Sequence, residues 1–405
     1  MAKQSLHGVR VLDLSRVLAG PWATQILGDL GADVIKIEKP GAGDDTRGWG
    51  PPFIDTRDGA DAAYFLAANR NKKSVTLDFT KPAGADVLRR LIPRCHILVE
   101  NFKTGALRKY GLDYERVRAL NPALVYCSVT GFGQTGPYAQ RAGYDYLIQA
   151  MGGLMSITGQ PDGAPGAEPM KVGVAVADLF TGMYAVTAIL AALRHAEATG
   201  EGQHIDVSLL DCQTAMLANQ AMNYLVSGVA PTRMGNAHPN ITPYQVFQAS
   251  DGYFVLAVGN NDQFRRFCAA SGLDALAEDP RFSDNAARLA HRDALIAAIA
   301  PTLAGKTIDA WIALFEDAGV PCGPINTIDR VFADPHVQAR GAVHTMTRSD
   351  GVATRLVANP IRMSATPPQA LHAPPPLGAD TDAVLRDALG LDDAAIAALR
   401  ADGAV

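Results

Sequence analysis

Residues 8–38, GVRVLDLSRVLAGPWATQILGDLGADVIKIE, have the pattern of a strand, a helix and a second strand. The first run, residues 8–15, is apolar and rich in β-branched side chains, as in a buried strand. Pro21 suits the first turn of a helix and Gly31 its end. The apolar run DVIKIE, residues 33–38, follows at once. These residues therefore predict a βαβ unit at the start of the chain.

The same alternation continues along the chain. A helical pattern over 83–92 leads into HILVENF, residues 96–102, and another over 114–120 leads into ALVYCSVTGF, residues 123–132. Strands that alternate with helices predict an α/β fold with a doubly wound, mostly parallel, Rossmann-like sheet that is buried on both faces. Ligands of such sheets bind at the carboxyl ends of the strands.

The sequence pattern changes in the second half of the chain. A long helical pattern over 179–197 is followed by a strand and a helix within 201–228, and residues 229–248 are rich in Gly, Pro, Asn and Thr, which indicates a linker or a functional loop. Residues 251–260 resemble a hairpin strand, and helical patterns alternate with turns over 262–320. We expect the following organisation: a large α/β domain over 1–205, a linker helix over 206–230, a small α+β domain over 231–325, a return linker over 326–370 and C-terminal helices over 371–405 that complete the large domain.

Composition and charge exclude several classes of protein. With 405 residues, 48% hydrophobic and 19% charged, the chain is typical of a globular protein and not of a disordered one. A net charge of −5 gives no electrostatic case for binding nucleic acid or an anionic membrane. The five cysteines form no CxxC and the N-terminus has no signal-peptide pattern, so we expect neither a zinc knuckle nor a disulfide framework, and a cytoplasmic location.

One carboxylate stands at the start of the apolar run 172–196, VGVAVADLFTGMYAVTAILAALRHA. Asp178 could be the N-cap of a core helix, because Asp is a favoured residue there. It could also be a nucleophile: near glycines 173 and 182, in apolar surroundings and held ionised by the helix dipole, it would be a poorly solvated carboxylate able to form a covalent acyl intermediate. The two interpretations do not exclude each other.

Several common catalytic motifs are absent. The first turn, SRVLAGPWA, is no GxGxxG fingerprint, and the chain has no Walker A lysine, no GxSxG elbow and no HExxH pair, so a dinucleotide, a serine nucleophile and a metal are not indicated. The runs NRNKKS, residues 69–74, and NFKTGALRKYG, residues 101–111, place cations after expected strand ends, where phosphate groups would bind. The alternative is that both runs are solvated surface.

Taken together, these segments strongly resemble the family III CoA-transferases. The resemblance lies in LSRVLAGPWATQILGDLGADVIKIEKPGAGDDTRGWG, NRNKKSVTLD, VENFKTGALRKYGL, SVTGFGQTGPYAQRAGYDYLIQAMGGLMSITG and VADLFTGMYA, which follow in order along the chain. The blocks QRAGYD, NAHPNITPYQVFQASDGYF and GVPCGPIN are most similar to the succinyl-CoA:glutarate (hydroxymethylglutarate) branch. The resemblance implies a CoA thioester as substrate, no permanently bound cofactor and an interlocked homodimer.

The resemblance also assigns residue roles. It makes Asp178 the nucleophile that attacks the thioester, forms a mixed anhydride with the acyl group and then an aspartyl-CoA thioester. Leu18 stands where the formyl-CoA enzymes have glutamine, and Lys109 where the family often has arginine. The loop over 235–241, with Asn236 and His238, matches a glycine-rich loop that covers the acyl group. By position, the CoA-binding residues would be Val17, Leu18, Ala19, Lys39, Lys72, Lys73, Asn101, Phe102, Lys103, Lys109, Ala142, Tyr144 and Asp145.

A dicarboxylic acid needs a cation for its second carboxylate. Arg16, just before the reacting turn, and Arg47 are the candidates, with the alternative that Arg47 only pairs with Asp44 or Asp45. The acid pair stays open among succinate, glutarate, hydroxymethylglutarate, citramalate, itaconate and mesaconate, because one methylene changes discrimination by only about 1 to 3 kcal/mol.

Two other functions remain as alternatives. An acyl-CoA racemase of the same superfamily carries GHD where this chain has Gly143, Tyr144 and Asp145, so the histidine base is missing. A non-catalytic CoA-binding protein of the same fold would tolerate the change of Asp178 to Asn.

Overall fold

The computed structural model describes residues 4–56 and 59–405. The chain forms two compact units, each with its own core. The first unit runs to Leu154 and takes in Val172–Val226 and Pro335–Val405, and the second consists of Met155–Lys171 and Ser227–Asp334. The first unit therefore contains both ends of the described chain.

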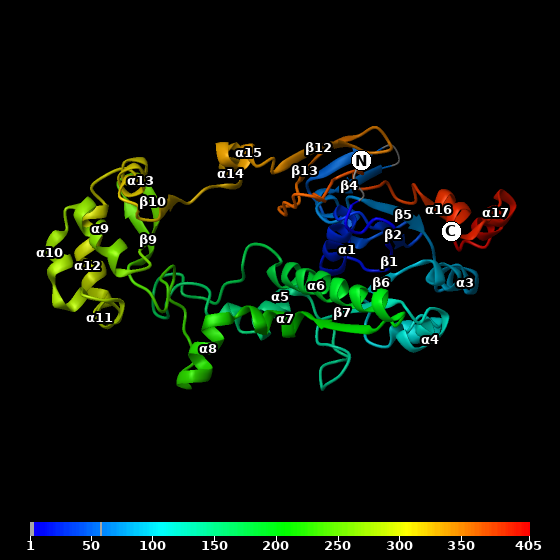
Figure 1. The fold of residues 1–405 in the computed structure, drawn as a ribbon, viewed down its shortest axis with the longest axis horizontal. Helices are drawn as coiled ribbons and strands as arrows, with labels where there is room; N and C mark the ends of the chain where they lie inside the picture. Colours follow the sequence, from blue (N-terminus) through cyan, green and yellow to red (C-terminus); the bar gives the residue numbers. More distant parts are fainter. Residues whose placement is uncertain (1–3, 57–58) are drawn as a thin grey trace. The chain divides into compact units, whose positions relative to one another are not determined.

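A parallel six-stranded sheet forms the centre of the first unit, which confirms the predicted α/β class (Figure 1). The strand order is β5-β2-β1-β6-β7-β8, so the chain builds one half outward from β1 and then returns to build the other half from β6. The two halves meet between β1 and β6, which is the topological switch point of the sheet. The strands are β1 (Arg10–Asp13), β2 (Asp33–Glu38), β5 (Lys72–Thr76), β6 (Ile97–Glu100), β7 (Val125–Thr130) and β8 (His204–Ser208).

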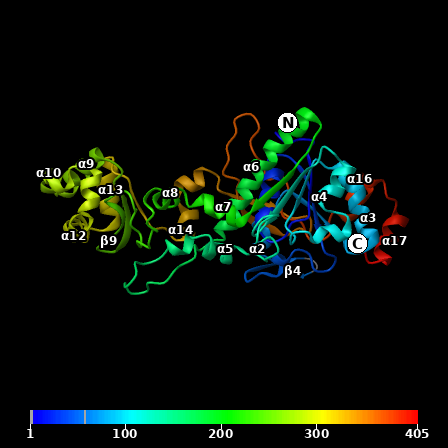
Figure 2. The same cartoon turned by 90° about the horizontal axis from the view of Figure 1, so that it is seen from below.

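Helices cover both faces of this sheet, because successive strand residues point to opposite sides. Val11 and Val99 pack against α1 (Ala19–Asp29) and α6 (Val176–Thr199), whereas Leu12 and Leu98 belong to the core on the other face. Figure 2 shows α6 on one side of the strands and α3, α4, α16 and α17 on the other. The helices of the second face are α3 (Pro82–Leu91), α4 (Tyr114–Leu120), α16 (Thr381–Leu389) and α17 (Asp393–Ala401).

Helix α6 is long and apolar enough to cross a membrane by composition. In the structure it packs on α1 at very short range: a Cβ on Gly182 would lie 2.8 Å from the carbonyl oxygen of Ala19 and 3.1 Å from the Trp22 ring. Ala185, Ile189 and other residues of α6 are fully buried in the core. This packing agrees with the predicted core helix.

The remaining elements of the first unit are short. Two of them are antiparallel hairpins that the sequence did not predict. These elements are α2 (Ala63–Leu66), α5 (Asp145–Met151), α7 (Leu209–Met216), α8 (Ala218–Ser227), α15 (Pro335–Ala339), the hairpin of β3 (Phe53–Thr56) and β4 (Gly59–Ala62), and the hairpin of β12 (Val343–Thr347) and β13 (Ala353–Val357).

The second unit has an antiparallel sheet of order β11-β10-β9 with helices packed around an aromatic core. Phe254, Phe267, Trp311 and Phe315 are fully buried there, and the Trp311 and Phe315 rings stack at 5.1 Å. The elements are β9 (Tyr244–Ala249), β10 (Gly252–Ala257), β11 (Cys322–Pro324), α9 (Asn261–Ser271), α10 (Asp274–Glu278), α11 (Asn285–Ala290), α12 (Arg292–Leu303), α13 (Ile308–Asp317) and α14 (Ile328–Ala333).

Two segments that the sequence assigned to loops are strands. Strand β9 begins within the segment 229–248 that was predicted as a linker or functional loop, because residues from 244 onward pair with β10. Strand β5 begins in the basic run NRNKKS, which we expected to follow a strand end and either to bind phosphate or to lie on the solvated surface. Lys72 can occupy a buried strand position because its Nζ lies 3.1 Å from the Asp13 carboxylate. A lysine neutralised by a residue far away in sequence leaves no local signal.

Candidate functional site

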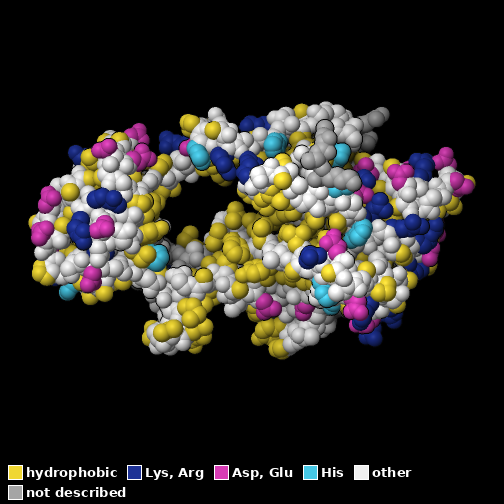
Figure 3. Space-filling view, viewed as in Figure 1, with side chains coloured by type: hydrophobic (Ala, Val, Ile, Leu, Met, Phe, Trp, Pro, Cys, Tyr) yellow, Lys and Arg dark blue, Asp and Glu magenta, His cyan; other side chains and the backbone are white. Residues whose placement is uncertain are grey.

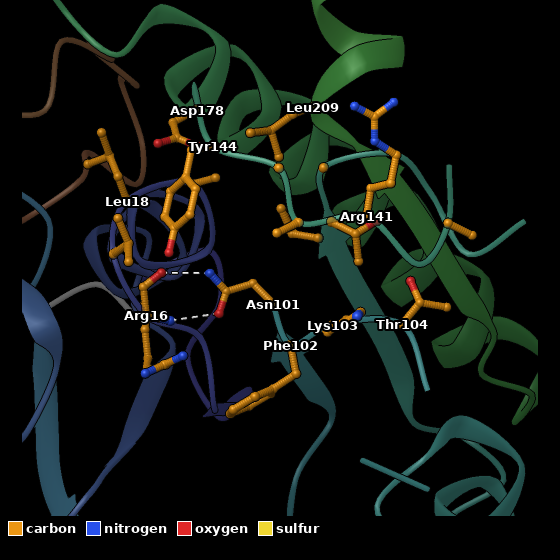
Figure 4. A pocket seen from close by; sticks show the side chains of 18 residues that line it. Arg16, Leu18, Asn101, Phe102, Lys103, Thr104, Arg141, Tyr144, Asp178 and Leu209 are labelled. Atoms are coloured by element: carbon orange, nitrogen blue, oxygen red, sulfur yellow. Dashed lines mark hydrogen bonds between the residues drawn. The ribbon is translucent and has the colours of Figure 1, made fainter. Parts of the chain in front are cut away.

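A pocket opens in the first unit at the switch point of the sheet. It has a volume of about 210 Å³ and collects the turn after β1, the turn after β6 and the start of α6 (Figure 4). This is the position at which open α/β sheets bind ligands. The lining residues are Arg16, Val17, Leu18, Ala19, Asn101, Phe102, Lys103, Thr104, Val129, Thr130, Gly131, Ala139, Arg141, Ala142, Gly143, Tyr144, Asp178 and Leu209.

Asp178 lies in the first turn of α6 and contributes to the pocket wall. The N-cap residue of this helix is Ala175, so the N-cap interpretation of Asp178 is wrong. The capping oxygen comes from another helix: the Asp145 carboxylate accepts hydrogen bonds from the backbone N–H groups of Ala177 at 2.8 Å and Asp178 at 3.2 Å. The Asp178 side chain is therefore left free to face the pocket.

The surroundings of Asp178 favour its protonated form. Burial, and secondarily the negative charge of Asp145, raise the pKa of Asp178 to about 7. This corrects the expectation that the helix dipole holds the carboxylate fully ionised at neutral pH. Tyr64, which the sequence did not indicate, lies close enough that the Asp178 charge, after burial, contributes to raising the pKa of its phenol.

The turn after β1 is held by the turn after β6. Asn101 makes two hydrogen bonds to the backbone of Arg16: its Oδ1 accepts from the N–H at 2.9 Å and its Nδ2 donates to the carbonyl at 2.6 Å, as the dashed lines in Figure 4 show. The Arg16 guanidinium lies 2.9 Å from Asp45 and 5.6 Å from the centre of the Phe102 ring. Arg16, Asn101 and Phe102 are thus one connected group at the pocket.

Lys103 and Arg141 add positive charge to the lining. Lys103 was a sequence candidate, whereas Arg141 was not. The guanidinium of Arg141 lies 4.5 Å from the Tyr138 ring and 5.3 Å from the Phe132 ring, which are cation–π distances. Its position beside Ala142, inside the block QRAGYD, was the available signal.

Ten of the sequence candidates come together in this pocket, and the others lie elsewhere. Arg47 is buried and binds Glu38 at 2.7 Å and Asp61 at 3.0 Å, so it neither lines the pocket nor pairs with Asp44 or Asp45 as the alternative interpretation had it. Lys72 is fully buried against Asp13. These side chains cannot reach a ligand without breaking buried ion pairs.

The remaining candidates are placed as follows. Lys73 pairs with Asp33 at 2.6 Å, Lys39 is exposed, and the ammonium group of Lys109 lies 4.7 Å from the Tyr110 ring. Asn236 and His238 belong to the second unit, where the backbone N–H of His238 donates to the Tyr244 carbonyl at 3.0 Å.

The side chains that line the pocket favour chemistry on an acyl group. A partly buried carboxylate with a pKa near neutrality can act as a nucleophile or an acid–base group. Histidine, the base of the racemase alternative, is not among the lining residues. Throughout residues 4–56 and 59–405, no cluster of His, Cys, Asp or Glu side chains could hold a metal ion.

Comparisons with known proteins agree with one another. The profile of CoA-transferase family III matches residues 6–381. The chain is 54% identical to a succinate–glutarate CoA-transferase of Agrobacterium fabrum, covering 95% of this chain and 96% of that one, and 43% identical to the succinyl-CoA:glutarate CoA-transferase of Homo sapiens, covering 99% and 90%. A crystal structure of a CAIB/BAIF family protein from Brucella suis superimposes with a TM-score of 0.84 at 51% identity, covering 95% of this chain and 100% of that one.

Proposed function

This chain belongs to CoA-transferase family III and is a CoA-transferase, and from that premise we propose that it moves CoA from succinyl-CoA to glutarate. The relatives with 54% and 43% identity that carry this activity in their names support the acid pair. The observation that carries the proposal is Asp178, a carboxylate with a pKa of about 7 in a pocket at the sheet switch point.

The transfer proceeds through Asp178 in two pairs of steps. An Asp178 oxygen attacks the thioester carbonyl, the C–S bond breaks, and CoA leaves as a thiolate while a succinyl–aspartyl anhydride forms. The thiolate then attacks the aspartyl carbonyl, which releases succinate and leaves an aspartyl-CoA thioester. Glutarate repeats both steps in reverse order, which yields glutaryl-CoA and frees the Asp178 carboxylate. No oxidant or net proton is needed. The overall exchange of one carboxylate for another keeps the thioester energy nearly constant, although the anhydride intermediates lie higher in energy.

The start of α1 supplies the stabilisation of the oxyanion. The first N–H groups of a helix have no partner within the helix, and α1 begins at Ala19 beside Asp178 in the pocket lining. The Leu18 side chain has no donor, so the backbone N–H groups of residues 18 and 19 take this role. Water exclusion by the pocket protects the anhydride from hydrolysis.

The cations and polar groups of the pocket divide between the two substrates. Asn101, Phe102, Lys103 and Tyr144 contact CoA, with Lys39 and Lys109 near its phosphates. Arg16 binds the distal carboxylate of the dicarboxylic acid, since it is the cation next to the reacting turn. Arg47, the other candidate, is excluded from this role because it is buried in ion pairs with Glu38 and Asp61. The Asp45 partner of Arg16 is half-exposed and can be displaced.

The enzyme works as a homodimer in the cytoplasm. Apolar side chains on α6 and α8 face outward, as the space-filling view illustrates over these helices (Figure 3). Leu225 and Val226 on α8 are 71% and 80% exposed, so these apolar side chains are available for contact with a second chain. The five cysteines are free, as in proteins of a reducing compartment.

A matrix of acyl-CoA donors against free acids, with each product thioester identified by mass, tests the function. We expect glutaryl-CoA from succinyl-CoA and glutarate, at a higher rate than thioesters of citramalate or mesaconate. A faster reaction with another acid would replace the acid pair and keep the reaction class. Racemisation of a branched acyl-CoA without a new thioester would support the racemase alternative, and no reaction with any pair would support a CoA-binding protein.

A further inference from the structure

Val17, in the pocket wall, has an unfavourable backbone conformation. Its φ is 70°, which lies in the left-handed region. A β-branched side chain is strongly disfavoured there, whereas glycine would adopt this angle without cost. Such strain persists only where neighbouring groups impose it, and it tends to occur at functional sites. The groups that hold Val17 are therefore the place to look for a positioning role.

A buried ion pair holds this turn from behind. Both oxygens of the Asp44 carboxylate accept from the Val17 N–H, each at 3.3 Å. The Lys36 ammonium group lies 2.8 Å from Asp44 and also donates to the carbonyl of Ser15 at 2.9 Å. The pair thus contacts the backbone at the strained residue and two residues before it.

This ion pair is not explained by stability alone. The side chains of Lys36 and Asp44 are both fully buried, and taking two charges out of water costs about as much as their attraction returns. Although burial by itself would raise it, the Lys36 charge and hydrogen bonds from Thr46 bring the pKa of Asp44 down to about 2. The Asp44 carboxylate therefore stays charged at every working pH. Neither side chain lines the pocket.

The turn that the pair holds is the one that faces Asp178. Val17, Leu18 and Ala19 form a wall of the same pocket, and Gly182, one turn after Asp178, leaves room for α6 to pack on the Ala19 carbonyl. A shift of this turn would therefore move the backbone N–H groups relative to the nucleophile. Misplacement of a reacting group by about 1 Å can cost a factor of about 100 in rate.

We propose that the Lys36–Asp44 ion pair is a positioning element for CoA transfer, which keeps Val17 in its left-handed conformation and so fixes the backbone of residues 17–19 opposite Asp178. This inference rests on the proposed function. It predicts that the enzyme needs the ion pair because residue 17 carries a side chain, and that glycine at this position makes the pair dispensable.

The test is a double-mutant cycle between D44N and V17G. D44N keeps the volume of the side chain but removes the charge, and it should lower kcat at least tenfold, by about 1.4 kcal/mol, in the otherwise unchanged enzyme. In the V17G background, D44N should lower kcat by less than about threefold, because glycine holds the turn without help. If D44N does not fold, K36M/D44N, which leaves no unpaired charge, replaces it in the same cycle.

Asp29 offers a matched control. It is a buried carboxylate paired with Arg70 at 2.5 Å and makes no contact with the turn, so D29N should have the same effect in both backgrounds. Equal loss of kcat from D44N with and without V17G would mean that the pair only stabilises the fold, and would overturn the inference. If the unchanged enzyme transfers no CoA at all, the proposed function fails instead, so the two failures are distinguishable.

Discussion

Asp178 owes its position to Asp145, a residue 33 positions earlier that caps the same helix turn. The sequence placed both residues at the site and the structure separates their roles: one carboxylate binds the free N–H groups and the other faces the pocket. Sequence reasoning could not make this separation, because a cap supplied from another helix leaves no local pattern. It placed Asp178 at a position that lines the pocket, and it incorrectly predicted what satisfies the helix end.

The pKa of Asp178 gives a prediction for the pH dependence of the reaction. In the proposed mechanism the nucleophile is the Asp178 carboxylate, and its pKa is raised to about 7. The rate of the first half-reaction should therefore rise about tenfold per pH unit below 7 and level off above it. Stopped-flow release of CoA thiolate between about pH 5.5 and 8.5 measures this profile.

The D145N variant provides the control for that profile. The amide of D145N would still offer an oxygen to the helix N–H groups, but the substitution would remove the negative charge that helps to raise the pKa of Asp178. The midpoint should move to lower pH. A rate that does not change over this pH range in the unchanged enzyme, as expected for a carboxylate with an ordinary pKa of about 4, would contradict the raised pKa of Asp178.

The same pKa has a consequence for stability. The acid form is favoured in the folded state, with a pKa of about 7 against 3.8 for the free side chain, so ionisation of Asp178 destabilises the fold as pH rises through this window. Full burial would correspond to about 4 kcal/mol, and partial exposure reduces this to about 1 to 2 kcal/mol. D178N should therefore be more stable than the unchanged enzyme at about pH 8 and equally stable at about pH 3.5. Urea denaturation at both pH values checks this; a D178N variant that is less stable at the higher pH would contradict it.

At the scale of elements, the close approach of α1 and α6 fixes the position of Asp178, the proposed nucleophile. A Cβ at Gly182 would lie 2.8 Å from the Ala19 oxygen, so G182A should push the helices apart, with a loss of about 1 to 3 kcal/mol of stability and a fall in kcat. The matched control is G173A, since a Cβ there meets nothing within 4 Å. G182A should have a lower stability in urea denaturation and a lower kcat than G173A. Equal stability and equal kcat for the two variants would mean that α1 and α6 can move apart at little cost.

Elements could be predicted where local pattern and tertiary environment agree. The helix over 114–120 is found at those residues, and the parallel strands that read as apolar runs are all present. Strand β5 was missed because Lys72 and Lys73 indicate a surface segment, and only Asp13 and Asp33, from other strands, neutralise them. Strand β9 was missed because its flanking loop, rich in Pro and Asn, dominated the pattern.

At the scale of the whole molecule, the family could be predicted from five blocks of sequence, and the profile match confirms it. The pocket brings together ten predicted residues from segments far apart in the chain, since strand order carries the turns after β1 and β6 to one place. What the sequence could not reveal is the set of ion pairs behind the pocket. Arg47 and Lys72 look like ligand-binding cations until their buried partners are known.

The exposed apolar surface leads to a prediction about assembly. We expect the protein to sediment at twice the chain mass of 42.8 kDa. L225E/V226E on α8 should shift it toward the monomer, because two carboxylates would have to be buried at the interface. L120E, at the end of α4 on the other face of the sheet, should leave the mass unchanged. A monomeric unchanged enzyme, active at the same concentration, would contradict the proposed dimer.

The central claim is that Asp178 carries the acyl group and then CoA. The most direct measurement is peptide mass spectrometry of the enzyme after mixing with succinyl-CoA alone and quenching in acid. We predict a succinyl or CoA adduct on the peptide that contains Asp178, which disappears when glutarate is added and is absent in D178N. Formation of glutaryl-CoA without any adduct on that peptide would contradict the account.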